Sequence, residues 1–158
     1  MRTTSAVLSF VLSVAAGCSA SRPESQEHLL RIYFVNHSRE AMDMKMVAGT
    51  PPPFLLYSVD RKIVTLTPEK TAMEQLLAGP HGDEIPEGYS TTLEGLHLKD
   101  FRVGGDTAYV YLEGGAQFSG LLTAPRLRAQ VERTLKEFPA IRMVEIWINE
   151  GRDFDSLK

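Results

Sequence analysis

Residues 96–112 read LHLKDFRVGGDTAYVYL, and this stretch decides the fold. Apolar and polar side chains alternate on both sides of Gly104-Gly105-Asp106. Alternation with a period of two is typical of a strand that buries one face, and glycines between two such runs are typical of a tight turn. The stretch therefore predicts a β-hairpin.

A helix and a strand are expected after the hairpin. Thr123 is the predicted N-cap of the helix and Pro139 is its predicted end. Between them, apolar residues recur at helical spacing, which places them on one buried face. This face is predicted to consist of Leu127, Val131, Leu135 and Phe138. Alternating apolar residues over 141–149 predict a last strand.

The segment before the hairpin predicts further strands and a helix. Residues 29–35 are rich in β-branched and aromatic side chains and predict the first strand. Residues 54–66 hold one or two strand-like runs around a polar turn at 60–62. Thr67-Pro68-Glu69 predicts a helix start, and Gly79-Pro80 predicts its end.

Residues 36–53 are expected to form a long irregular connection, which is either functional or a mobile insertion. The predicted element order is then β-β-α-β-β-α-β. This order predicts an α+β fold with a mixed or antiparallel sheet and two helices packed on one sheet face. The length of 158 residues suits a single compact domain.

The charge balance argues against nucleic-acid binding. The formal net charge is −3, and the basic residues are dispersed among acidic ones. Binding to phosphates requires a concentrated basic face. We therefore expect no nucleic-acid partner.

The N-terminus is typical of an export signal. Arg2 supplies a positive charge, residues 6–16 are mostly apolar, and small residues precede Cys18. Ala15-Ala16-Gly17-Cys18 resembles a bacterial lipobox, in which the cysteine thiol is alkylated by a lipid. The apolar stretch is too short for a permanent membrane span. The alternative is an ordinary signal that is cut near Ala16 or Cys18 and leaves a free thiol.

The cysteine count favours the lipidated form. Cys18 is the single cysteine, so no intramolecular disulfide can form and an exported free thiol would be exposed to oxidation. The predicted division is a signal peptide at 1–17, a lipidated cysteine and flexible spacer at 18–28, a domain at 29–151 and a C-terminal tail at 152–158. The expected location is the extracytoplasmic side of a bacterial envelope. Ser19 carries no acidic retention signal, so the outer membrane is favoured if two membranes are present.

Five short motifs over 29–151 resemble the GerMN domain, a family first described in the spore-germination protein GerM and widespread in bacterial lipoproteins. The motifs are Ile32-Tyr33-Phe34, Leu76-Leu77-Ala78-Gly79-Pro80, Ile85-Pro86-Glu87-Gly88, Asp106 to Leu112 and Phe138-Pro139-Ala140-Ile141. The resemblance implies a small ring-building or docking module of the cell envelope. The family has no assigned catalytic residues that could be carried over to this chain.

A search for catalytic and metal-binding motifs finds none. There is no Gly-x-Ser-x-Gly motif, and no histidine pair has metal-ligand spacing. Asp153 and Asp155 lack the other ligands of a calcium loop. Asp83 and Glu84 are adjacent acids that we expect to be solvated rather than catalytic. We predict no catalytic, cofactor-binding or metal-binding residues.

Three aromatic residues form the candidate binding surface. Tyr109, Tyr111 and Trp147 occupy alternating strand positions, so they either line an open sheet face or lie in the core under a helix. The leading hypothesis is a non-catalytic envelope lipoprotein that docks onto a protein partner. One alternative is a periplasmic carbohydrate or peptidoglycan binder, and another is an uncharacterised hydrolase.

Overall fold

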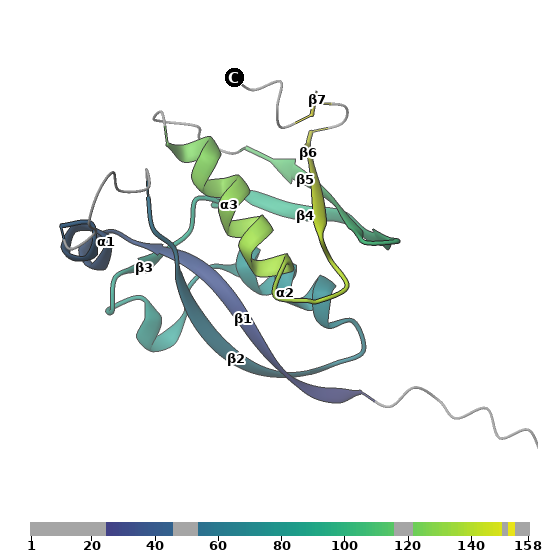
Figure 1. Cartoon of the computed structure of the whole chain (residues 1–158), viewed down its shortest axis with the longest axis horizontal. Coiled ribbons are helices and arrows are strands. Elements are labelled where there is room, and N and C mark those ends of the chain that lie inside the picture. The colour runs from purple at the N-terminus through teal and green to yellow at the C-terminus, as the bar shows by residue number, and fades with distance from the viewer. Residues whose placement is uncertain (1–24, 46–53, 116–121, 150–151, 154–158) are drawn as a thin grey trace, which may run out of the picture.

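The hairpin forms where the sequence predicts it. β4 (Leu96–Gly104) pairs antiparallel with β5 (Thr107–Gly114). Gly105, in the turn, has a φ of 63°, a left-handed conformation that glycine adopts without a steric penalty. The computed structural model describes four parts of the chain, which are residues 25–45, 54–115, 122–149 and 152–153 (Figure 1).

The hairpin belongs to a four-stranded sheet with the order β4-β5-β6-β7. α3 (Thr123–Leu135) connects the hairpin to β6 (Met143–Ile148), which runs parallel to β5. β7 (Arg152–Asp153) pairs antiparallel with the end of β6 and lies within the segment predicted as a tail.

A separate three-stranded sheet contains the first strands. β1 (Gln26–Asn36) pairs antiparallel with β2 (Tyr57–Thr65) and, through its last two residues, with β3 (Tyr89–Ser90). The α+β class and the single domain are confirmed, but the strands form two sheets where one was expected. β1 begins at Gln26, so residues 26–28 of the predicted spacer belong to a strand.

The turn predicted at residues 60–62 is wrong, because β2 runs through it unbroken. Asp60 and Lys62 are exposed, whereas Arg61 is 7% exposed. Three consecutive polar residues indicate a turn only if all of them remain in water. Arg61 instead finds buried hydrogen-bond partners, which the local sequence does not reveal.

The long connection also contains a short helix that the sequence analysis missed. α1 (His37–Asp43) is capped by Asn36, whose side chain accepts a hydrogen bond from Arg39 N at 3.0 Å. Glu40 is buried and accepts hydrogen bonds from Arg126 of α3 at 2.7 and 2.9 Å. An ion pair rather than an apolar stripe holds this helix, so hydrophobic periodicity does not detect it.

α2 (Pro68–Ala78) lies where it was predicted and is followed by the 3₁₀ turn η1 (Gly82–Glu84). Gly79 ends the helix with a φ of 78°. Thr67 occupies the N-cap position but makes no side-chain capping hydrogen bond. The predicted N-cap of α3 is one residue off, because Leu122 and not Thr123 occupies that position.

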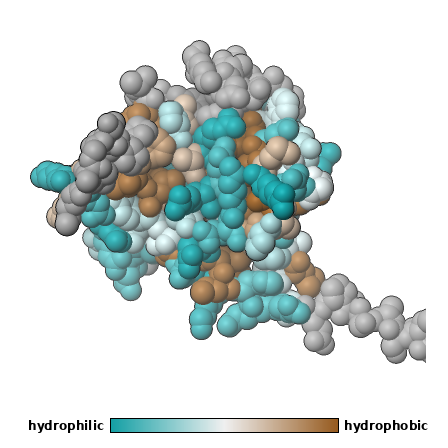
Figure 2. All heavy atoms as spheres, viewed as in Figure 1, coloured by the Kyte–Doolittle hydropathy of each residue, from teal (hydrophilic) through white to brown (hydrophobic). Residues whose placement is uncertain are grey.

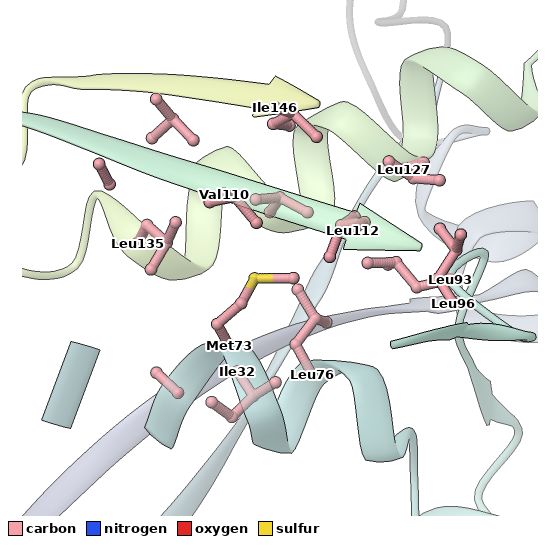
Figure 3. Close-up of a cluster of buried hydrophobic side chains, with 14 of the residues drawn as sticks. Ile32, Met73, Leu76, Leu93, Leu96, Val110, Leu112, Leu127, Leu135 and Ile146 are labelled. Atoms are coloured by element: carbon pink, nitrogen blue, oxygen red, sulfur yellow. The ribbon is translucent and has the colours of Figure 1, made fainter. Parts of the chain in front are cut away.

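The helices α2 and α3 pack between the two sheets (Figure 1). α2 contacts β1 and β4, α3 contacts β1 and β6, and the two helices contact each other. The predicted stripe of α3 is confirmed, since three of its residues are fully buried and Phe138 packs at the margin. The core between the layers includes Ile32, Met73, Leu76, Leu93, Leu96, Val110, Leu112, Leu127, Leu135 and Ile146 (Figure 3).

Two buried polar side chains of α3 occupy the edge of β1. Thr134 Oγ1 accepts a hydrogen bond from Tyr33 N at 3.1 Å, and Gln130 Nε2 donates one to Tyr33 O at 3.0 Å. Gln130 Oε1 also accepts from Thr92 N at 2.9 Å. The helix thus takes the place of a neighbouring strand, which explains why β1 does not pair with the second sheet.

A second buried polar cluster surrounds Arg61. Its guanidinium donates to Gly79 O at 3.0 Å, to Gln75 Oε1 at 2.9 Å and to Glu84 Oε1 at 3.1 Å. The guanidinium also lies 5.3 Å from the centroid of the Phe34 ring. Arg61 therefore ties β2 to the end of α2 and to η1. Glu84, expected to be solvated, is largely buried in this cluster.

Replacing Gln130 with Leu is expected to lower the free energy of unfolding by about 2–4 kcal/mol, because Tyr33 O and Thr92 N lose their buried partner. Chemical denaturation of the variant measures the change. Arg128→Gln, on the same helix and partly exposed, is the matched control and should change stability by less than about 1 kcal/mol. Equal stability of wild type and Gln130→Leu would contradict the bridging role.

The Arg61–Glu84 pair predicts a dependence of stability on pH. Burial alone raises the pKa of Glu84, but hydrogen bonds from Arg61 and from His81 N outweigh it and hold that pKa below the ordinary value of 4.5. Because the folded-state pKa is the lower one, the pair stabilises the fold above the ordinary value. This contribution is lost as the pH falls through the depressed pKa.

Glu84→Gln is expected to destabilise the protein at pH 7 by about 3 kcal/mol, since Arg61 keeps a buried charge without its counter-ion. Its stability should also fall less than that of wild type when the pH is lowered toward 3. Denaturation curves across this range measure both effects. The exposed neighbour Asp83, changed to Asn, should behave like wild type.

Candidate functional site

The three predicted aromatic residues lie on the outer face of the second sheet. Along β5, Ala108, Val110 and Leu112 are buried in the core, and the tyrosines alternate with them. Trp147 likewise lies between buried Ile146 and Ile148 of β6. Because both helices pack on the opposite face, the interpretation that these aromatics lie under a helix is wrong. All three remain partly exposed.

Tyr111 and Trp147 form a stacked pair across β5 and β6. Their ring centroids are 6.2 Å apart, and the ring planes differ by 12°. The Arg102 guanidinium, from β4, lies 5.6 Å from the Tyr111 ring centroid. These distances are typical of aromatic stacking and of a cation–π contact. We name Arg102, Tyr111 and Trp147 the aromatic row, since they come from three neighbouring strands.

An ion pair holds Arg102 in this row. Arg102 Nε donates to Asp100 Oδ2 at 2.6 Å, and Phe101 N donates to Asp100 Oδ1 at 2.9 Å. The hydrogen bond from Arg102 lowers the pKa of Asp100, and Asp100 in turn raises the pKa of Arg102. Both groups are solvated, so the pair orients the guanidinium more than it stabilises the fold.

Tyr109 lies beside the row and not within it. One of its ring carbons would lie 3.4 Å from a β-carbon added at Gly104, so the ring covers that glycine at the end of the hairpin. Its registered neighbours are Arg102 on β4 and Glu145 on β6. The structure therefore brings Tyr111 and Trp147 together and leaves Tyr109 to extend the surface.

The Trp147 indole N–H is buried, and no described residue accepts a hydrogen bond from it. A buried donor without a partner costs free energy. Among the described residues the polar end of this side chain therefore gains no hydrogen bond, whereas its ring contributes to the stack.

Asp100 and Arg102 were not predicted from the sequence as parts of this site. Both lie on the polar side of the predicted hairpin, and their spacing of two places them on one strand face. The spacing of Asp100 and Arg102 is visible in the sequence. It indicates a site only when the pairing register places Arg102 beside the tyrosines. The irregularity between Leu98 and Asp100 sets that register.

A hollow lies on the exposed side of α3, with a volume of about 430 Å³. Lys136 Nζ donates to Glu132 at 3.0 Å, and Tyr33 Oη donates to Glu137 at 2.6 Å. Its acidic groups are thus engaged with neighbours in the same surface, and it presents no concentrated charge of one sign.

The described residues contain no cluster of three or more His, Cys, Asp or Glu side chains that could hold a metal ion. His37 and His81 lie 3.5 and 3.6 Å from Glu40 and Glu84, which already belong to arginine pairs. Among the same residues, no helix is both long and apolar enough to cross a bilayer. Cys18 and Asp155 lie outside the described residues, and the side chain of Asp153 is not described.

The solved structures that are similar to this chain include GerMN domains. The tandem GerMN domains of the sporulation protein GerM from Bacillus subtilis share 16% identity with a TM-score of 0.56, covering 84% of this chain and 43% of that chain. The first GerMN domain of the same protein gives 17% identity and a TM-score of 0.54, covering 80% and 85%. This likeness concerns the fold.

Comparison with curated protein sequences gives no match. The profile of the Germane family, described as sporulation and spore germination, matches residues 31–153. This range spans both sheets and all the core helices, and it agrees with the fold likeness. The chain therefore belongs to the Germane family and carries a single GerMN-like domain.

Proposed function

We propose that this protein is a lipid-anchored envelope protein whose GerMN-like domain is a non-catalytic docking module. The aromatic row carries the docking part of the proposal. Tryptophan, tyrosine and arginine are the residue types most often found at the energetic centre of protein interfaces. Here one of each lies side by side on the open face of a sheet.

The row is held in place before any partner binds. The sheet fixes the backbone of all three residues, the rings of Tyr111 and Trp147 restrain each other, and Asp100 orients Arg102. Ordering side chains on binding costs about 0.5–1.5 kcal/mol for each flexible residue. A surface with this much prior order suits a protein partner of complementary shape.

Two buried carboxyl groups of the described domain support a non-catalytic role. Glu40 is paired with Arg126, and Glu84 with Arg61. Hydrogen bonds from these arginines and from backbone N–H groups outweigh the effect of burial and keep the pKa of both carboxyls low. A general acid at neutral pH requires a raised carboxyl pKa. These buried acids are therefore suited to structure.

The sequence at Cys18 supports the anchor. Small residues precede this single cysteine, and a polar segment separates it from β1. Two or three acyl chains give stable attachment, whereas one chain binds only marginally. The domain would then be tethered outside the cytoplasm, on the outer membrane where two membranes exist. Its partner is a protein of the envelope.

A glycan ligand is the second candidate for the same surface. Sugar rings pack on exposed aromatic faces, and the stacked Tyr111–Trp147 pair offers such faces. The protein partner is favoured because Arg102 occupies one side of Tyr111. The glycan function predicts binding to purified peptidoglycan, whereas the docking function does not.

The docking function predicts a crosslink that depends on the row. A photoreactive amino acid at Glu145, which is exposed and registered with Tyr109, should give one discrete adduct in cells. Trp147→Ala or Arg102→Ala should weaken the adduct by about 30-fold, the effect of removing a side chain worth 2 kcal/mol. The same probe at Lys70, an exposed residue of α2, is the control.

Trp147→Phe tests whether the indole N–H contributes to the stability of the fold. Because the indole N–H has no acceptor among the described residues, this variant should unfold at the wild-type denaturant concentration or slightly above it. Adducts that are equally strong in wild type and Trp147→Ala contradict docking through the row. Tryptophan-dependent co-sedimentation with peptidoglycan, without a protein adduct, would favour the glycan function.

The anchor predicts a response to Cys18→Ser. Serine cannot form the thioether to lipid, so the variant should move from the membrane fraction to the soluble fraction and keep its signal. Mass spectrometry of the mature wild-type N-terminus should show acyl chains on Cys18. Unchanged membrane partition and processing of the serine variant would overturn the anchor.

A further inference from the structure

We refer to the antiparallel pair of β1 and β2 as the β1–β2 hairpin. Its outer face carries an exposed apolar patch at one end. Leu29 is 61% exposed, Val64 62% and Leu66 56%. Glu27 is registered with Val64 and Leu29 with Lys62, so Leu29 and Val64 are diagonal neighbours on one sheet face. Leu66 directly follows Thr65, the last residue of β2, at the same end of the strand pair. We name these three residues the hairpin patch.

The patch lies away from both the core and the aromatic row. The inward face of the hairpin carries Leu30, Ile32 and Ile63, which pack into the core. The patch belongs to the first sheet, whereas the row lies on the second. Figure 2 shows apolar surface near the end of the hairpin at which β1 starts.

Ion pairs lie next to the patch, toward the middle of the two strands. Arg31, the next outward residue of β1 after Leu29, lies 3.2 Å from Asp60 and 3.3 Å from Glu137. These charged side chains are partly exposed to solvent and lie at the middle of the β1–β2 hairpin. Apolar side chains are therefore concentrated at its N-terminal end and are not spread along the strand.

We propose that the hairpin patch rests on the surface of the membrane that holds the lipid anchor. The proposal depends on the anchor proposed above. β1 starts at Gln26, only seven residues after Ser19, the residue next to Cys18. A chain of this length spans at most about 25 Å when extended, and about 15 Å as a flexible coil.

The short connection between Cys18 and β1 favours the membrane as the surface that the hairpin patch contacts. A tether that ends beside the patch holds it within reach of the lipid headgroups at all times, so even weak apolar contact becomes intramolecular. Three aliphatic side chains suit the headgroup boundary, where apolar groups insert and the flanking charges of Glu27 and Lys62 remain in water. Contact at this end leaves the aromatic row on the other sheet available to a partner.

The test uses the full lipidated chain in vesicles of phosphatidylethanolamine and phosphatidylglycerol. Val64→Cys carries an environment-sensitive fluorophore, and lipids with a headgroup quencher report contact. Ser58→Cys is the matched control, since it is exposed on the same strand and outward face, about 20 Å away along β2. The Cys18 thiol is blocked by lipid, so each variant carries one label.

We expect quenching at position 64 to exceed that at position 58 several-fold. Adding Leu29→Ser and Leu66→Ser should reduce quenching at 64 to the control level while the unfolding curve stays unchanged, because both residues are exposed. Equal, weak quenching at both positions in protein shown by mass to be lipidated overturns the membrane contact and leaves the anchor intact. Concentration-dependent self-association through the patch overturns it in favour of a second copy.

Absence of lipid mass on Cys18 overturns the anchor and the membrane contact together. The two failures are therefore distinguished by the mass of the mature N-terminus, which does not depend on the fluorescence.

Discussion

The hydrogen bonds between α3 and the edge of β1 are the constraint on which the architecture depends. Gln130 and Thr134 are fully buried, and they supply a donor and an acceptor to Tyr33 where a neighbouring strand would otherwise pair. Buried backbone groups must be satisfied, so β1 is confined to the first sheet. The second sheet packs on the other side of the helices, and no described helix covers its outer face.

Buried charges, like buried backbone groups, also require partners. Arg61 with Glu84 and Arg126 with Glu40 each join segments that have few apolar contacts of their own, namely η1 and α1. Charges this deep stabilise the fold only when a counter-ion lies beside them, as Glu84 and Glu40 do. The apolar core determines which helices and sheets pack together. The buried charges determine how the connecting segments are attached to them.

The two proposed surfaces follow from this division. One sheet presents the aromatic row, and the other presents the hairpin patch next to the start of β1. Because they lie on different sheets, the proposed membrane contact and the proposed partner contact do not compete for one surface.

The sequence by itself determined the elements whose signals are local. The glycine turn before Thr107, the stripe of α3 and the stop at Gly79 were predicted, because periodicity and backbone preference act within a few residues. It also predicted the aromatic residues of the candidate surface, although not which way they face. Only the tertiary structure decided that there are two sheets, that Arg61 is buried and that Arg102 joins Tyr111. Each of these depends on a partner distant in sequence, and the free energy of a buried polar group is set by that partner and not by its neighbours in the chain.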